Sequence, residues 1–363
     1  MTSLVKQALQ VFVVCFIGSA ALANEGSVIF PDRPGAGVEL HLQRPLVGRE
    51  ASDILKVFVG AAHACCDNKS PIAGSYSSDD KSLTFKPAFD FIEGQRYTVQ
   101  LNDGDLREFT LYANVLSGTP DVVAIYPSGH TIPENSLRFY VHFSQPMAPH
   151  VADEFIKLID SDGKEATAAF MSISQELWNE ERTRLTLLMD PGRIKRGVAQ
   201  NLALGPALLE GNRYSILVKD GWPSAVTGQE TQRFEKSFQV SPALRSLPDA
   251  DAWQFEQPKL MSEDPLVILF DRPFDHQLAQ KTIIVRDENG QRVEGHVTLK
   301  IQERSWHFQP VAQWKTRKLQ IEVDARREDV AGNNFNDLLD HALGTEAPTT
   351  GNKTIYLDLM PSP

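Results

Sequence analysis

The chain has 363 residues, of which 42% are hydrophobic and 23% are charged, with 47 acidic and 36 basic side chains. This length favours two or three domains over one small core. The net charge of −11 repels phosphate backbones and anionic lipid surfaces, which argues against nucleic acid as a partner. The 23 glycines and 22 prolines suit many short strands joined by turns.

The first residues have the pattern of a secretory signal peptide. Lys6 precedes a short apolar run, and Ala21 and Ala23 stand at the two positions that a signal peptidase reads. The run is shorter than the roughly 20 apolar residues that a membrane span needs, and no later segment is long and apolar enough. We therefore expect residues 1–23 to be removed, and a secreted or periplasmic mature chain that begins near Asn24 without a transmembrane segment.

Beyond the signal peptide, one pattern of strands occurs three times. Each copy opens with a strand that ends at a proline and continues with a second strand that leads into a turn. In the second and third copies this turn contains Asp162-Gly163 and Asn289-Gly290, dipeptides that favour a tight hairpin. Further strands follow, and two of them begin with the similar sequences Gly94-Gln95-Arg96-Tyr97 and Gly211-Asn212-Arg213-Tyr214. The three opening strands are predicted at residues 38–45, 137–146 and 266–273.

The opening strand of the second copy alternates between apolar and polar positions. Its apolar positions are Leu137, Phe139, Val141 and Phe143, and its polar face carries Arg138, Tyr140 and His142. Such alternation predicts a strand with one buried face. Several short strands, regular turns and about 100 residues per copy are the features of a β-sandwich, in which two sheets cover each other's apolar faces. The sequence therefore predicts an all-β protein.

Three motifs resemble those of a known family. They are the strand that ends in Phe143-Ser144-Gln145-Pro146-Met147, the strand from Gly211 to Val218, and the loop Asp329-Val330-Ala331-Gly332-Asn333. Together they resemble bacterial immunoglobulin-like domains of the S-layer type. The resemblance covers nearly all of the mature chain and is weakest in the first copy, which lacks the loop motif. Such modules occur as spacers, surface-layer elements and accessory domains, so the fold alone does not fix the function.

The resemblance and the repeat together imply three tandem immunoglobulin-like β-sandwich domains. We place them at residues 24–118, 119–243 and 244–363. The second domain is longer because residues 174–184 and 192–209 are inserted. Inserted loops of a sandwich either build a binding site or cover a polar edge, and the sequence favours the edge cover.

Known catalytic motifs are missing from the sequence. It has no Gly-x-Ser-x-Gly elbow, no His-Glu-x-x-His, no phosphate loop and no dinucleotide fingerprint. We therefore expect no catalytic residue and no cofactor. Carboxylates are abundant, so a polysaccharide-active enzyme that works from the inserted segments stays as an alternative.

The unusual chemical motif is the segment at residues 63–67, which contains His63, Cys65 and Cys66. Once Cys15 leaves with the signal peptide, Cys65 and Cys66 are the only cysteines, and they are exposed to an oxidising compartment. The favoured interpretation is a disulfide between them, although neighbouring Cα atoms lie about 3.8 Å apart, closer than in ordinary disulfides. Alternatively, both thiolates and His63 bind copper or zinc. A third interpretation leaves the cysteines free or cross-linked to a partner chain.

Two tryptophans of the second copy are candidate ligand-binding residues. Trp178 lies in the first inserted segment and Trp222 in a later loop. The remaining tryptophans, Trp253, Trp306 and Trp314, lie in or beside strands of the third copy, and we expect them to pack in its core.

The leading hypothesis is an exported, non-catalytic protein that acts as a structural or binding module at the cell envelope. Its expected partner is a protein or polysaccharide of the envelope. A metal- or redox-handling protein centred on His63, Cys65 and Cys66 is the main alternative.

Overall fold

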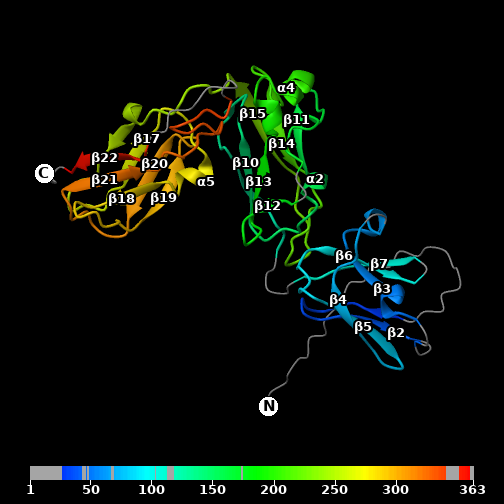
Figure 1. The fold of residues 1–363 in the computed structure, drawn as a ribbon. Helices are drawn as coiled ribbons and strands as arrows, with labels where there is room; N and C mark the ends of the chain where they lie inside the picture. The colour runs from blue at the N-terminus through cyan, green and yellow to red at the C-terminus, as the bar shows by residue number, and fades with distance from the viewer. Residues whose placement is uncertain are drawn as a thin grey trace, which may run out of the picture. The chain divides into compact units, whose positions relative to one another are not determined.

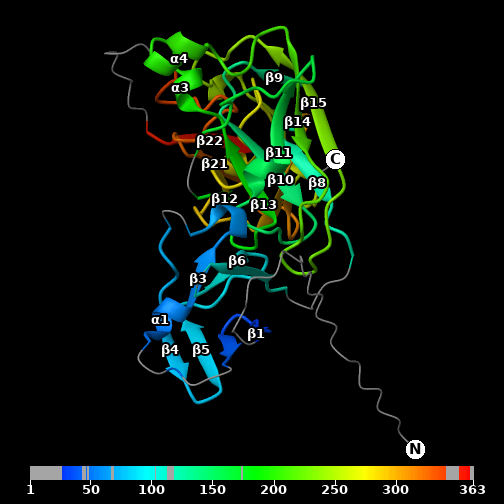
Figure 2. The ribbon, with the colours of Figure 1, turned by 90° about the vertical axis from the view of Figure 1, so that its right-hand side faces the viewer.

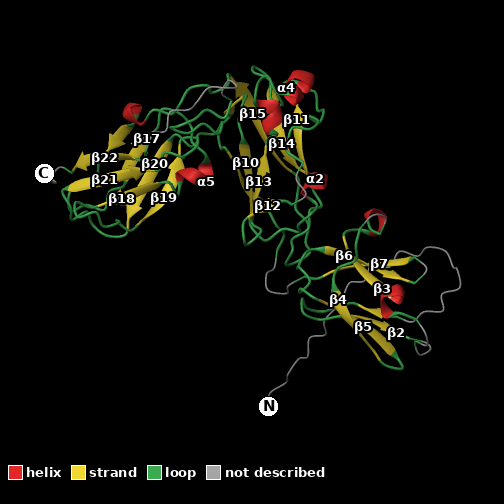
Figure 3. Cartoon of the chain, in the orientation of Figure 1, coloured by secondary structure: helices red, strands yellow, loops and turns green. Residues whose placement is uncertain are grey.

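The computed structural model describes residues 27–42, 46, 49–66, 69–102, 104–112, 118–172, 175–340 and 351–359. The predicted signal peptide lies outside the described residues. The chain divides into two compact units. The first unit contains Tyr97–Phe109 and the described residues before Ile92, and the second contains Ile92–Arg96 and the described residues from Thr110 onward. Figure 3 shows that strands dominate and that helices are short, as predicted for an all-β protein.

The first unit contains two antiparallel sheets (Figure 1). In spatial order, one sheet consists of β1 (Val28–Ile29), β2 (Val38–His41), β5 (Ser82–Pro87) and β4 (Gly74–Ser78), and the other of β3 (Leu55–Val59), β6 (Arg96–Leu101) and β7 (Asp105–Thr110). The helix α1 (Ala51–Ile54) precedes β3, and the short 3₁₀ helix η1 (Ala62–Ala64) follows β3. Each sheet has one buried face, to which β2 contributes Val38 and Leu40 and β6 contributes Val99 and Leu101.

The second unit begins with a pair of four-stranded sheets. In spatial order they consist of β12 (Leu177–Trp178), β13 (Arg184–Leu188), β10 (Arg138–Phe143) and β8 (Val122–Tyr126), and of β11 (Ile156–Asp160), β14 (Arg213–Val218), β15 (Phe234–Ser241) and β9 (Thr131–Pro133). Side chains of both sheets form one hydrophobic core, in which Phe139 of β10 and Phe238 of β15 lie 5.6 Å apart between ring centroids. This pair of sheets is the second sandwich.

A third pair of sheets completes the second unit. In spatial order they consist of β16 (Gln254–Glu256), β17 (Leu266–Leu269), β20 (Ser305–Pro310) and β19 (Gly295–Lys300), and of β18 (Ile283–Arg286), β21 (Lys318–Val323) and β22 (Lys353–Asp358). A single core again joins the two sheets, and Trp253, Trp306 and Trp314 are buried in it, as the sequence predicts. The 3₁₀ turn η2 (Ala250–Ala252) precedes β16, and helix α5 (His276–Ala279) lies between β17 and β18.

The order of the strands is the same in all three pairs of sheets. If the strands of each pair are lettered along the chain, one sheet has the order A-B-E-D and the other the order C-F-G. In the second sandwich the additional strand β9 pairs in parallel with β15. The A-B-E-D and C-F-G arrangement is that of an immunoglobulin-like sandwich, which confirms the predicted fold class. The domain boundaries at residues 118/119 and 243/244 stay predictions.

The inserted segments of the second sandwich form regular structure. The first supplies β12, which pairs with β13 at the edge of its sheet, in the D position that β4 and β19 occupy in the other two sandwiches. The second contains α3 (Pro191–Ile194) and α4 (Ala199–Leu204), which lie next to each other (Figure 2). Arg193 of α3 is buried and donates to the carbonyl oxygens of Gly205, Thr167 and Pro206 at 2.6, 3.0 and 2.9 Å. One guanidinium therefore holds this insertion against the sandwich.

No helix among the described residues has both the length and the apolar character needed to cross a membrane.

Candidate functional site

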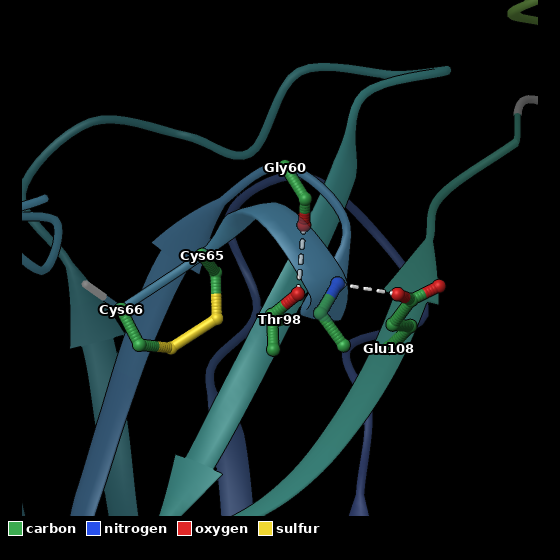
Figure 4. Close-up of a disulfide and its surroundings, with 6 residues drawn as sticks. Gly60, Cys65, Cys66, Thr98 and Glu108 are labelled. Atoms are coloured by element: carbon green, nitrogen blue, oxygen red, sulfur yellow. Dashed lines mark hydrogen bonds between the residues drawn. A yellow bond between two sulfur atoms is a disulfide. The ribbon is translucent and has the colours of Figure 1, made fainter.

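The cysteine pair lies in the first unit, directly after η1. The Sγ atoms of Cys65 and Cys66 are joined by a bond of 2.11 Å (Figure 4). Cys65 is buried, and Cys66 has a φ of 76°, a left-handed backbone conformation that is uncommon outside glycine. In this paired state neither sulfur is a thiolate, the form that binds metals, so the metal-binding alternative requires the reduced pair and stays a prediction.

Two hydrogen bonds attach this loop to the neighbouring strands. Thr98 Oγ1 of β6 donates to the carbonyl oxygen of Gly60 at 2.7 Å, and the backbone N–H of Ala62 donates to the Glu108 carboxylate of β7 at 2.5 Å (Figure 4). His63 is exposed. Within the described part of the chain, no three or more His, Cys, Asp or Glu side chains are arranged to hold a metal ion.

The two candidate tryptophans are part of the second sandwich's packing. Trp222 is fully buried, its ring stacks on Phe155 at 5.5 Å, and its indole N–H donates to the carbonyl oxygen of Ala148 at 2.9 Å. Trp222 therefore offers no face to a ligand, which corrects the expectation from sequence. Gly221 and Pro223 beside it are typical of a surface turn. The rings that bury Trp222, those of Phe143, Phe155 and Trp178, come from other parts of the chain.

Trp178 is half-buried in the edge strand β12. Its ring lies 5.8 Å from that of Trp222, and its indole N–H donates to the Glu176 carboxylate at 2.6 Å. The same carboxylate accepts from the backbone N–H groups of His150 and Ala152, both at 2.7 Å. Trp178 and Glu176 therefore attach the edge strand to the start of α2 (Ala152–Phe155).

A polar cluster that the sequence does not predict lies within the second unit, where α5 contacts the outer face of β10. We call it the junction cluster. Its members are Tyr126, Arg138, Tyr140, His142 and Arg184 of the second sandwich, and Asp275, His276, Gln277, Glu303 and Glu328 of the third. The alternation along β10 predicts that its polar face is exposed to solvent. In the structure, the third sandwich covers this face.

Asp275 is the centre of one half of the junction cluster. Its carboxylate accepts from Tyr140 Oη at 2.8 Å, and also from the backbone N–H groups of Gln277 and Leu278, where it caps the start of α5. Arg138 lies 3.4 Å from the same carboxylate and 2.5 Å from that of Glu328. Burial, reinforced by the charge of Asp275, strongly raises the pKa of Tyr140, so its hydroxyl stays protonated and continues to donate.

The two histidines form the other half of the junction cluster. His276 is buried, stacks on Tyr126 with 3.4 Å between ring centroids, and has its Nδ1 atom 3.3 Å from Glu303 Oε1. His142 lies with its ring centroid 5.2 Å from that of Tyr126 and 6.2 Å from that of His276. Burial is the main reason that the pKa of His142 falls to about 4, and the charges of His276 and Arg184 add to it.

The turn that places Glu303 has an unusual backbone. Ile301, Gln302 and Glu303 have φ values of 50°, 57° and 61°, three consecutive left-handed residues without a glycine. Each costs about 1 to 2 kcal/mol relative to the right-handed form. The second Glu303 oxygen accepts from the backbone N–H of Ser128 at 2.9 Å, across the junction. The strained turn therefore ends at Glu303, the residue that links the third sandwich to the second.

The Asp-x-Ala-Gly-Asn loop of the third copy is a closed turn. Asp329 accepts from the backbone N–H groups of Ala331 and Asn333 at 2.9 and 3.0 Å, and the Val330 carbonyl accepts from the N–H of Leu137 at 2.9 Å. Burial outweighs these bonds and raises the pKa of Asp329 to about 6. This loop is therefore a further contact between the third copy and the second.

Comparisons with known proteins leave the family open. No family model matches the chain, and no curated protein matches it. Among solved structures, the N-terminal part of the bacterial S-layer protein SbsC is 13% identical, with a TM-score of 0.24, over 67% of this chain and 44% of that one. This chain therefore spans less than half of that SbsC fragment.

Two further solved structures are tandem immunoglobulin-domain proteins. The I-band fragment I67-I69 of titin is 11% identical over 94% of this chain and 100% of its own, with a TM-score of 0.18. The N-terminal Ig1-2 module of the Drosophila receptor protein tyrosine phosphatase DLAR is 10% identical over 67% of this chain and 99% of its own, with a TM-score of 0.21. Likenesses at this level carry no functional argument, and the fold assignment rests on the order of the strands.

Proposed function

We propose that this chain is an exported, non-catalytic protein whose tandem immunoglobulin-like sandwiches act as a structural or binding module at the cell envelope. The observation that carries the proposal is the repetition of one strand order, A-B-E-D with C-F-G, in three consecutive parts of the chain. Repetition of one sandwich supplies several comparable surfaces on a single chain. Such a chain suits a structural role as a spacer, or a role in binding a partner. The expected partner is a protein or polysaccharide of the envelope.

The use of polar side chains in the second unit supports a structural role. Asp275, Tyr140 and Arg138 are bonded to one another across the junction, and the carboxylate of Asp340 joins Arg196 and Arg245 at 2.7 and 3.1 Å. Buried charge pairs contribute little net stability, but they specify one arrangement of the groups that they connect. We infer that these groups serve to fix how the third copy attaches to the second.

Export rests on the N-terminal sequence pattern, and it is tested by expressing the full chain in a bacterial host. We expect a processed chain that begins near Asn24, leaves the cytoplasm and sediments with washed envelope fractions. The variant Ala23→Arg, which spoils the cleavage position, is the matched control and should stay unprocessed. An unprocessed wild-type chain in the cytoplasm would contradict export. A processed chain that never sediments with the envelope would contradict the binding role alone.

We also propose that Cys65 and Cys66 are joined as a disulfide in the exported protein. An oxidising compartment favours the bond, and the two sulfur atoms are already paired in the fold. The intact mass of the mature chain should therefore be two hydrogen atoms lighter than that of the dithiol and should increase on reduction. A maleimide reagent should label neither cysteine before reduction. Quantitative labelling of the untreated protein, or a mass with one bound metal ion, would contradict the disulfide.

A further inference from the structure

The junction cluster places His142 where its protonation state affects the contact between two sandwiches. His142 lies on the outer face of β10, and His276 and Gln277 of the α5 segment lie against it. We propose that this junction is an acid-sensitive latch, in which protonation of His142 weakens the docking of α5 on β10. This regulation goes beyond the proposed function, because it does not depend on export or on any envelope partner.

The contact between Gln277 and His142 favours the neutral form of His142. Arg184 donates from Nη1 to Gln277 Oε1 at 2.5 Å, which fixes the orientation of the Gln277 amide. The amide nitrogen Nε2 of Gln277 is thereby placed 3.5 Å from His142 Nε2, and it can only donate. This long contact favours His142 Nε2 as the acceptor. A protonated His142 would place two donors face to face.

The charges around His142 also oppose its protonation. Its own strand carries Arg138 and Tyr140, β8 carries Tyr126, β13 carries Arg184, and the third sandwich supplies Asp275, His276, Glu303 and Glu328. The nearby carboxylates already have other partners. Asp275 is bonded to Tyr140, Glu328 to Arg138, and Glu303 to His276 and the Ser128 backbone. After burial, the charges of His276 and Arg184 are what lower the pKa of His142.

The direction of the pH effect follows from the two states of His142. When docked, its pKa is lowered to about 4, chiefly by burial and then by His276 and Arg184. When released, it returns to an ordinary histidine pKa of about 6.5. The released state therefore binds the proton more tightly, so docking is complete above about pH 6.5 and weakens as the pH falls toward 4. At pH 5 these values correspond to at most about a thirtyfold shift toward release. Partial solvent exposure of His142 reduces this shift.

The test is hydrogen–deuterium exchange of the mature chain at pH 7.5 and pH 5, with exchange times scaled for the intrinsic pH dependence of amide exchange. We expect the amides of α5 and of the Ile301–Glu303 turn to exchange several-fold faster at pH 5, while the central strand β14 is unchanged. His142→Gln, which retains a neutral acceptor, should remove the difference. The matched control His296→Gln changes an exposed histidine of β19 and should retain it.

Two further measurements keep the proposal open to refutation if His142→Gln disturbs the junction by itself. His142→Lys, which carries a fixed charge, should give fast exchange of α5 already at pH 7.5. In histidine-labelled wild-type protein, the NMR titration of His142 should show a pKa well below 6.5. An ordinary His142 pKa, a His142→Lys variant that stays protected, or wild-type exchange that is independent of pH would each overturn the latch.

Discussion

The B strands of the first and second sandwiches, β2 and β10, occupy the same place in the fold and differ in what covers their outer faces. On β2 the outward side chains Glu39 and His41 face solvent and lie 3.4 Å from each other. On β10 the outward side chain of Tyr140 is buried, and it is bonded to Asp275, which lies 135 residues further along the chain. The same alternation therefore produces a solvated face in one sandwich and an internal junction in the other.

The largest expected loss in the free energy of unfolding comes from Asp275→Ala, which removes the carboxylate at the centre of the junction cluster. This change leaves the Tyr140 hydroxyl without its acceptor and removes the cap of α5, and breaking a buried charge pair costs about 3 to 5 kcal/mol. All five tryptophans lie in the second unit, so tryptophan fluorescence during urea unfolding reports on that unit. Glu235→Ala, which breaks an exposed pair with Arg233, is the control and should cost under about 1 kcal/mol. Equal stabilities of the two variants would show that the junction does not stabilise the unit.

A smaller loss in the free energy of unfolding is expected from Tyr140→Phe, which removes one hydroxyl and keeps the ring. Its bond to the Asp275 carboxylate is charge-assisted, and loss of such a bond costs about 1.5 to 3 kcal/mol. The raised pKa of Tyr140 also predicts that this phenol remains protonated when exposed tyrosines ionise. Ultraviolet difference spectra at alkaline pH should therefore show the same ionising tyrosines in wild type and variant. An additional phenol that ionises near pH 10 in the wild type alone would contradict the buried bond.

The smallest effect is expected on β2, where Glu39→Ala removes an exposed partner of His41. Such a surface change should alter the free energy of unfolding by less than about 0.5 kcal/mol. Because the first unit contains no tryptophan, its unfolding is the part of the far-ultraviolet circular dichroism transition that tryptophan fluorescence does not follow. A loss comparable to that of Asp275→Ala would show that the outer face of β2 is also covered.

The fold could be predicted from the sequence because its signals are local. Alternation along β10 and the positive φ values of 79° and 78° at Gly163 and Gly290 follow from neighbouring residues. The contacts of the candidate site are not local. Asp275 shows no sequence relation to Tyr140, and Trp222 is buried by Phe155 from another part of the chain. Period-two patterns identify the two faces of a strand, but they do not show which segment covers a polar face.

The parallel pairing of β9 with β15 has a mechanical consequence. These strands lie near the entry and the exit of the second sandwich, and they run in the same direction with Thr131 opposite Gln239 and Pro133 opposite Ser241. Tension applied between the two ends of this sandwich pulls the strands past each other, so their hydrogen bonds are strained together rather than opened one at a time. Among the described strands of the first and third sandwiches, no such parallel pair is present. Under tension, we expect the second sandwich to be the last of the three to unravel.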